Sequence, residues 1–307
     1  MKKNLLLILI VIFFSTNDVY ALENNYMNLN NIPISEIEYE NLIKLGFTGE
    51  QIKSMTEDEF LANKDLEGEI VAQTVKYYKT TTTYREEKLT RTFNYNIVDS
   101  NTEEITEEEY EKAESQISTY ALLNGYTETT YKKMTTTIIS VNNRYRYKND
   151  LFWKIMPATR SYDILSIGID STVSGIPNTK YYRTTYDMTY NSGGGYCSTS
   201  TTGTWNMGPN GYVVTFDLPN NTSSANVTAL SSYMYFEVQK LTNNTINTLN
   251  AYGNYKHAQK SVNSSVTTGV SVGINGAISF DISISSEITT SYDSMSTAQA
   301  VLFGISW

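Results

Sequence analysis

Residues 262–288 read VNSSVTTGVSVGINGAISFDISISSEI and contain the longest two-residue alternation in the chain. Apolar residues fill most even positions, whereas Ser, Gly, Asn and acidic residues fill most odd ones. Successive side chains of a β-strand point to opposite faces, so this pattern predicts strands with one apolar and one polar face. The apolar face comprises Val262, Val266, Val270, Val272, Ile274, Ile278, Phe280, Ile282, Ile284 and Ile288.

Asn275-Gly276 lies between the two halves of this stretch and is a strong hairpin signal, because both residues tolerate positive φ. A two-residue loop would place apolar residues of one strand opposite polar residues of the other. A three-residue loop over 275–277 avoids that mismatch, and it is the loop we expect. It would pair Ile274 with Ile278, Val272 with Phe280, and Val270 with Ile282.

Two functions are compatible with such a hairpin. An antiparallel sheet with one buried face gives this alternation in ordinary soluble sandwiches, which favours a structural or binding role. A transmembrane β-strand gives it as well, and needs about 9 to 11 residues. Residues 266–274 and 278–288 have that length, and their polar face carries few charges. The candidate membrane or partner surface is therefore Val266, Val270, Val272, Ile274, Ile278, Phe280, Ile282, Ile284 and Ile288.

The N-terminus has the pattern of a secretory signal peptide. Lys2 and Lys3 precede an apolar run over residues 5–14, and Val19-Tyr20-Ala21 supplies the small and aliphatic residues of a cleavage site. A membrane-spanning helix would need about 18 or more apolar residues, and this run is shorter. We therefore expect cleavage after Ala21 and a secreted, extracellular protein.

The charge distribution excludes one class of partner and divides the chain. Removing residues 1–21 leaves 21 basic and 31 acidic residues, a net charge of −10, which makes nucleic acid a poor partner. Residues 22–150 hold 14 basic and 23 acidic residues, whereas residues 151–307 hold 7 and 8. This difference suggests two units.

Helix signals are confined to the first unit. Ser35 with Glu38, Thr48 with Gln51, and Thr56 with Glu59 each match a capping box, which predicts a small helical module within residues 22–66. Residues 67–150 are rich in Thr and Tyr at strand spacing, with a turn expected near residues 86–87. One acidic helix is expected to begin at Thr106 and to end at Asn124-Gly125.

Short strands and turn signals alternate through the second unit. Strands are expected over residues 162–169, 180–190, 199–207, 211–218 and 232–241, followed by the C-terminal hairpin. The predicted fold class is mainly β: an antiparallel β-sandwich over residues 151–307, with a small N-terminal helical module and one inserted acidic helix. We expect residues 151–307 to fold without residues 22–150.

Few residues suit catalysis or metal binding. His257 is the single histidine, which excludes zinc sites built from several histidines and leaves one residue for any Ser-His-Asp triad. Cys197 is the single cysteine and has no neighbouring base in the sequence, so we interpret it as an unreactive thiol. A secreted hydrolase could use two carboxylates among Asp163, Asp170, Asp187 and Glu237. No metal, cofactor or catalytic residue is predicted.

The phrases PATRSYD at residues 157–163 and YGNYKHA at residues 252–258 resemble uncharacterised exported proteins of Gram-positive bacteria. The resemblance covers the C-terminal half of the chain and implies no known activity.

Together these patterns favour a secreted or cell-surface, non-catalytic binding protein whose ligand is an unknown extracellular protein or glycan. The 25 tyrosines suit such a surface, because Tyr combines an apolar face with a polar tip. The first alternative is a membrane-inserting, pore-forming-like protein that uses the 262–288 hairpin, and the second is a secreted hydrolase.

Overall fold

The computed structural model describes residues 26–89, 92–114, 125–157, 160–241, 243, 245–258, 266–272, 278–284, 292–305 and 307. The expected signal peptide lies outside these residues. Most of the described chain forms antiparallel strands, which confirms the mainly β fold class.

Eight strands form the larger sheet, in the order β10-β9-β13-β6-β5-β3-β4, with β8 paired to β13. Every neighbouring pair in this sheet is antiparallel. Its strands are β3 (Gly68–Leu89), β4 (Thr92–Ile105), β5 (Gly125–Val141), β6 (Arg144–Ile155), β8 (Val173–Gly175), β9 (Tyr181–Tyr190), β10 (Gly195–Ser200) and β13 (Ala225–Lys240).

Six strands form the smaller sheet, in the order β11-β12-β7-β14-β17, with β18 paired to β14. A single apolar core fills the space between the two sheets, with Trp153 and Met234 from the larger sheet and Leu165 and Val214 from the smaller one. The two sheets therefore form a sandwich, as expected. The strands of the smaller sheet are β7 (Tyr162–Ile169), β11 (Thr204–Gly208), β12 (Gly211–Asp217), β14 (Thr248–Ala258), β17 (Tyr292–Ser294) and β18 (Ala298–Phe303).

The N-terminal helical module forms as its caps predict. Capping boxes open α1 (Glu36–Lys44) and α2 (Gly49–Lys53), and Gly46 ends the first helix with a φ of 79°. Thr56 caps α3 (Glu57–Asn63), but the Glu59 side chain does not complete the expected box. It points instead into the interface with the larger sheet. A short pair of strands, β1 (Tyr26–Met27) and β2 (Pro33–Ile34), precedes the helices.

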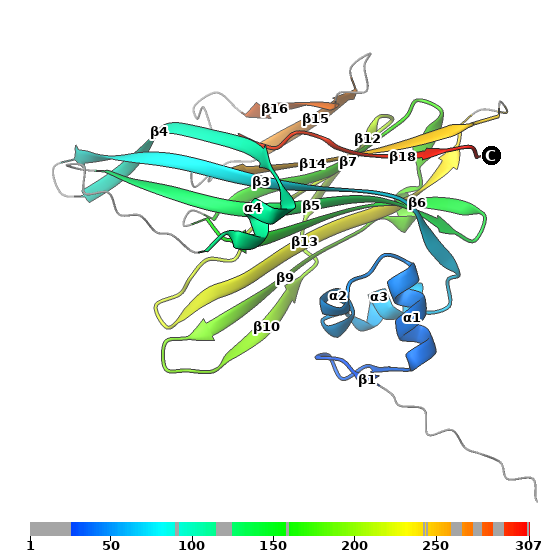
Figure 1. Cartoon of the computed structure of the whole chain (residues 1–307), viewed down its shortest axis with the longest axis horizontal. Coiled ribbons are helices and arrows are strands. Elements are labelled where there is room, and N and C mark those ends of the chain that lie inside the picture. Colours follow the sequence, from blue (N-terminus) through cyan, green and yellow to red (C-terminus); the bar gives the residue numbers. More distant parts are fainter. Residues whose placement is uncertain are drawn as a thin grey trace, which may run out of the picture.

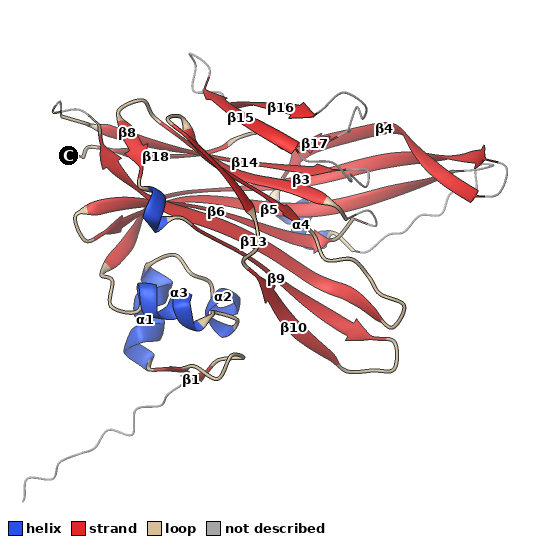
Figure 2. Ribbon diagram, turned by 180° about the vertical axis from the view of Figure 1, so that it is seen from behind, coloured by secondary structure: helices blue, strands red, loops and turns tan. Residues whose placement is uncertain are grey.

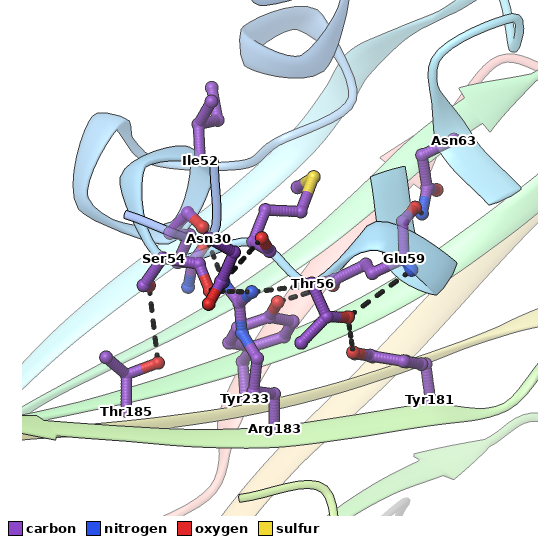
Figure 3. A network of polar contacts seen from close by, with 12 residues as sticks. Asn30, Ile52, Ser54, Thr56, Glu59, Asn63, Tyr181, Arg183, Thr185 and Tyr233 are labelled. Carbon is purple, nitrogen blue, oxygen red and sulfur yellow. Dashed lines mark hydrogen bonds and ion pairs between the residues drawn. The ribbon is translucent and has the colours of Figure 1, made fainter. Parts of the chain in front are cut away.

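Three buried cations of the larger sheet bind this module on the side that faces the sheet. Arg183 donates to the carbonyl oxygen of Ser54 over 2.8 Å, and its Nη1 lies 2.9 Å from Glu59 Oε2 (Figure 3). Lys148 donates to the carbonyl of Gly46 over 3.0 Å, and Arg146 donates to Asn63 Oδ1 over 2.6 Å. Each cation thus meets the C-terminal end of a different helix, where the helix dipole favours positive charge.

Three expected boundaries in the chain are wrong. Strand β3 continues through residues 86–87 and pairs Leu89 with Thr92, so the turn lies later than expected. Helix α4 (Glu107–Lys112) ends well before Asn124, because Ala113 has an extended backbone. The strand expected over residues 199–207 is two strands, β10 and β11, in different sheets. The chain crosses between the sheets at Gly203, where an added Cβ would lie 2.6 Å from Val214.

The expected division at residue 150 lies inside β6 (Arg144–Ile155). Strands from both sides of that position belong to the eight-stranded sheet, with β5 and β13 flanking β6. Independent folding of residues 151–307 stays a prediction. In the second unit, the only helical turn within the described residues is the short 3₁₀ helix η1 (Pro177–Thr179).

The molecule is layered. In Figures 1 and 2 the helical module lies against the outer face of the larger sheet, and the hairpin of β15 (Val266–Val272) and β16 (Ile278–Ile284) lies beyond the smaller sheet. The two additions to the sandwich therefore occupy opposite sides of it.

Candidate membrane hairpin and its anchor

The predicted C-terminal hairpin is present, with its pairing shifted. Val272 pairs with Ile278, Val270 with Phe280, and Val266 with Ile284. Each even-numbered residue therefore still faces an even-numbered partner, as the alternation requires. The expected pairs are wrong by two residues, because Val272 pairs with Ile278 and not with Phe280. Ile274 and Ile288, from the candidate surface, lie outside the described residues.

The hairpin is an insertion between two residues that are already neighbours. Ala258, the last residue of β14, pairs directly with Tyr292, the first residue of β17. A two-residue turn would suffice to join such a pair. The chain instead inserts residues 259–291 there. Within the described residues, β15 and β16 pair only with each other and contribute no strand to either sheet of the sandwich.

The outer face of the smaller sheet beside the hairpin is half polar. β15 lies beside β11, an edge strand of the smaller sheet, and beside β12, the neighbour of β11. Leu165 and Val214 point into the sandwich core, so their chain neighbours point to the opposite, outer face. Four such outer residues are buried all the same, namely Ile164, Ser166, Val213 and Thr215. Two of the four are apolar, Ile164 and Val213, and two are polar.

A buried ion pair fixes the point where the chain returns from the insertion. Asp293, in β17, accepts a hydrogen bond from Lys132 of β5 and another from Thr80 of β3, the latter over 3.2 Å. Lys132 also lies 4.7 Å from the centroid of the Trp153 ring. We call the ends of β14 and β17 that flank the insertion its feet. Because β3 and β5 belong to the larger sheet and β17 to the smaller one, this ion pair links one foot to the opposite sheet.

A second buried pair fixes the outgoing chain. His257, in β14, is the register partner of Asp293, and its backbone N–H donates to Asp293 Oδ1 over 3.0 Å. Its ring Nδ1 lies 2.8 Å from Asp163 Oδ1, and Tyr255 donates to the same carboxylate. Both feet of the insertion are therefore held by one cluster of four ionisable side chains: Lys132, Asp163, His257 and Asp293.

The charges in this cluster shift one another's pKa values. Burial raises the pKa of Asp163 to about 6, against the opposing pull of His257. Burial opposes the charged form of His257, but Asp163 and Asp293 together raise the pKa of its imidazole. At Asp293 burial again acts against charge, yet Lys132 and His257 hold the pKa of that carboxyl below its usual range. The pair of Asp163 and His257 thus binds a proton more readily than in the unfolded chain.

The structure gives the hydrolase candidates separate surroundings. Asp170 accepts from the backbone N–H of Asn250 over 2.8 Å, and Glu237 pairs with Arg144 and Arg146. Asp187 lies beside Cys197, and burial together with this carboxylate raises the pKa of the thiol to about 11. A thiol with so high a pKa is mostly protonated and a poor nucleophile.

The sequence contains one Gly-x-Ser-x-Gly motif, at residues 269–273. In hydrolases with this motif the serine occupies a sharp turn between a strand and a helix. Ser271 lies instead within β15, paired with Ser279, so the motif here is part of a hairpin strand. Among the described residues, no group of three or more His, Cys, Asp or Glu side chains could hold a metal ion.

The comparisons with known proteins identify no family. No family model and no curated protein matches the chain. A solved structure, the collagen binding domain of the surface protein RspB from Erysipelothrix rhusiopathiae, is similar over 59% of this chain and 72% of its own. The sequence identity is 6% and the TM-score is 0.23. Within the described residues, no helix is long and apolar enough to cross a membrane.

Proposed function

We propose that the mature protein acts outside the cytoplasm as a non-catalytic binding protein whose β15–β16 hairpin enters a lipid bilayer. The observation that carries this proposal is the insertion of residues 259–291 between two residues that pair directly. An ordinary sandwich hairpin would contribute its strands to a sheet. This one forms a separate two-stranded unit with the alternation of a membrane strand.

Detachment of the hairpin has a low cost in hydrogen bonds. Because β15 and β16 pair with each other in the described chain, moving them away from the smaller sheet breaks no backbone hydrogen bond of that sheet. The buried cluster keeps both feet of the insertion in place during such a movement. The hairpin can therefore leave while the sandwich stays folded.

Insertion also sets a requirement on stoichiometry. Unpaired backbone groups are too costly inside a bilayer, so strands cross it only as closed barrels. A single hairpin has two unpaired edges. Several copies of the protein would therefore have to insert together, with the hairpin of each copy pairing with its neighbours.

Dye release from liposomes tests the proposal. The variant Val272→Asp with Ile282→Asp puts two charges on the apolar face of the hairpin. On the lipid face of a barrel, an Arg or Lys at the bilayer midplane costs about 2 to 4 kcal/mol, and an Asp costs less but is still unfavourable. We expect the parent protein to release dye and this variant to release it at least about tenfold more slowly.

The matched control is Ser271→Asp with Ser283→Asp, which adds the same two charges at odd positions, on the polar face. This control should release dye nearly as the parent does, and circular dichroism should show the same fold for all three proteins. Equal effects of the two variants, or no release by the parent from neutral, anionic and cholesterol-containing vesicles, would contradict membrane insertion.

A further inference from the structure

A groove lies on the side of the molecule opposite the hairpin, partly within the helical module and partly between that module and the larger sheet. It consists of two recesses that share Glu50 and Lys53 of α2. The first recess has a volume of about 470 Å³ and is lined by Tyr26, Glu36 and Tyr39. The rings of the two tyrosines meet edge to face, with centroids 6.0 Å apart.

The second recess has the larger sheet as its floor. Its volume is about 100 Å³, and its floor includes Phe152 of β6, Thr185 and Asp187 of β9, and Ser231 of β13. Leu29 of the helical module forms part of the opposite wall. Phe152 is 41% exposed, in a position where strand alternation would otherwise allow a polar residue.

The charges of the groove select against anionic ligands. Three carboxylates line it, those of Glu36, Glu50 and Asp187, and they would repel an anionic ligand. Lys53 lies where the two recesses meet and forms an ion pair with Glu50 over 3.4 Å, which neutralises part of this negative charge. A neutral ligand with many hydroxyl groups can donate to the carboxylates and accept from the ammonium group at once. It can also use the hydroxyls of Thr185 and Ser231.

The aromatic rings fit the same ligand. Tyr26 is 39% exposed in the first recess, and Phe152 is 41% exposed in the second. An exposed ring presents a flat apolar surface on which the C–H face of a sugar ring can lie, while the polar groups around it fix the orientation. Because one such ring lies in each recess, the groove offers a platform at both ends.

We propose that this groove binds a neutral oligosaccharide of at least two sugar rings, one lying on Phe152 and the other on Tyr26. Hydroxyl groups of the bound sugar donate to Glu36, Glu50 and Asp187. The site rests on the proposed extracellular binding role and is independent of the hairpin.

The groove is built before the ligand arrives. The second recess has walls from the helical module and from the sheet, and Arg183 joins these two through the carbonyl of Ser54 and the carboxylate of Glu59. Ser54 itself lines the second recess. A site whose walls are already fixed loses less entropy on binding than one that must close.

The test begins with an array of immobilised saccharides that holds lactose, chitotriose and mannotriose beside 3′-sialyllactose and a sulfated counterpart. We expect the full-length mature protein to bind at least one neutral saccharide and to bind its sialylated or sulfated form at least about tenfold more weakly, because three carboxylates line the groove. Calorimetric titration with the best neutral saccharide then gives the affinity of each variant.

Phe152→Ala is the deciding variant, and Tyr190→Ala is its matched control, because Tyr190 is 42% exposed on β9 and does not line the groove. We expect Phe152→Ala to weaken binding at least about tenfold and Tyr190→Ala to change it less than about twofold. Glu50→Gln should weaken binding as well. All three variants should have the melting temperature of the parent.

Three results would overturn the site: no binding of any neutral saccharide, preference for an anionic saccharide or a basic peptide, or equal effects of Phe152→Ala and Tyr190→Ala. The hairpin variant Val272→Asp with Ile282→Asp should bind the saccharide as the parent does. Dye release without saccharide binding would therefore reject the groove alone, and saccharide binding without dye release would reject the hairpin alone.

Discussion

The helical module and the hairpin are both additions to the same sandwich, and the structure holds them in opposite ways. The module shares an apolar core with the larger sheet, through Phe47 and Ile52 on one side and Ile139 and Tyr235 on the other. It is also bound by the buried cations Arg146, Lys148 and Arg183. The hairpin pairs only with itself within the described residues and is held by the buried ion pairs beside the insertion. The module is thus held along its whole contact with the sheet, whereas the hairpin is held at its base.

The largest expected effect is on the helical module. Arg183→Met leaves the fully buried Glu59 carboxylate without its guanidinium partner. Breaking a buried ion pair in this way costs about 3 to 5 kcal/mol. We expect the free energy of unfolding in urea to fall by that amount. Adding Glu59→Gln should restore a part of it, because no unpaired charge then remains.

Arg144→Met is the control for that experiment, because Arg144 is exposed and its ion pair with Glu237 should contribute at most about 1 kcal/mol. A loss below about 1 kcal/mol for Arg183→Met would remove the distinction between a fixed module and a detachable hairpin.

A smaller effect is expected at the hairpin. Replacing residues 259–291 with Asn-Gly joins Ala258 to Tyr292 by a two-residue turn. The replacement uncovers the outer side chains of Ile164 and Val213, and each would lose at most about 1.5 to 3 kcal/mol if it became fully exposed. We expect one cooperative thermal transition, slightly below that of the parent, and no dye release. Loss of cooperative unfolding would show that the sandwich needs the hairpin.

The smallest effect concerns the anchor and its dependence on pH. The pKa values of Asp163 and His257 are raised in the folded protein, so their contribution to stability is present at mildly acidic pH. It is lost as the pH rises through the folded pKa values, above about 6 for Asp163. The lowered pKa of Asp293 has the opposite sign, and its contribution is lost as the pH falls below its folded pKa.

We therefore expect the free energy of unfolding to decrease by on the order of 1 kcal/mol between pH 5.5 and pH 8. Urea titrations at several pH values measure this slope. Asp163→Asn should flatten the slope, whereas Asp187→Asn, a change at an exposed carboxylate, should leave it unchanged. A parent protein that gains stability over this interval would contradict the account of the anchor.

Local patterns in the sequence predicted local structure well. The capping boxes at Ser35, Thr48 and Thr106 form as expected, because the hydrogen bonds of a capping box join residues three apart. At Thr56 only half of the capping box forms. The Glu59 side chain interacts instead with Tyr233 and Arg183, which are distant in the sequence. The alternation predicted that even-numbered residues of the hairpin pair with even-numbered residues. It could not predict the shift by two residues, since apolar residues face each other in both registers.

Features that depend on pairing between distant strands were not predictable. The charge difference between the two halves of the chain suggested a boundary at residue 150, but net charge reports on exposed residues and not on which strands pair. The cluster around His257 was missed for the same reason, because its ring partner, Asp163, lies 94 positions away in the sequence. A charged residue in an otherwise apolar strand, such as Asp163 in β7, was the available signal for buried pairing.

The position of Asp293 also decides how the molecule carries mechanical load. A force that a membrane exerts on the inserted hairpin would act first on β17, because β17 pairs with β14 over three residues only. The pull would meet Asp293 at the second of these residues, where Lys132 and Thr80 transfer the tension to the long central strands of the other sheet. Three residues further on, Tyr78 donates to the carbonyl oxygen of Ser296 over 2.6 Å and forms a second stop. The chain is thus attached to the larger sheet at two points, Asp293 and Ser296, and these attachments would stop the separation of β17 before it reaches the core.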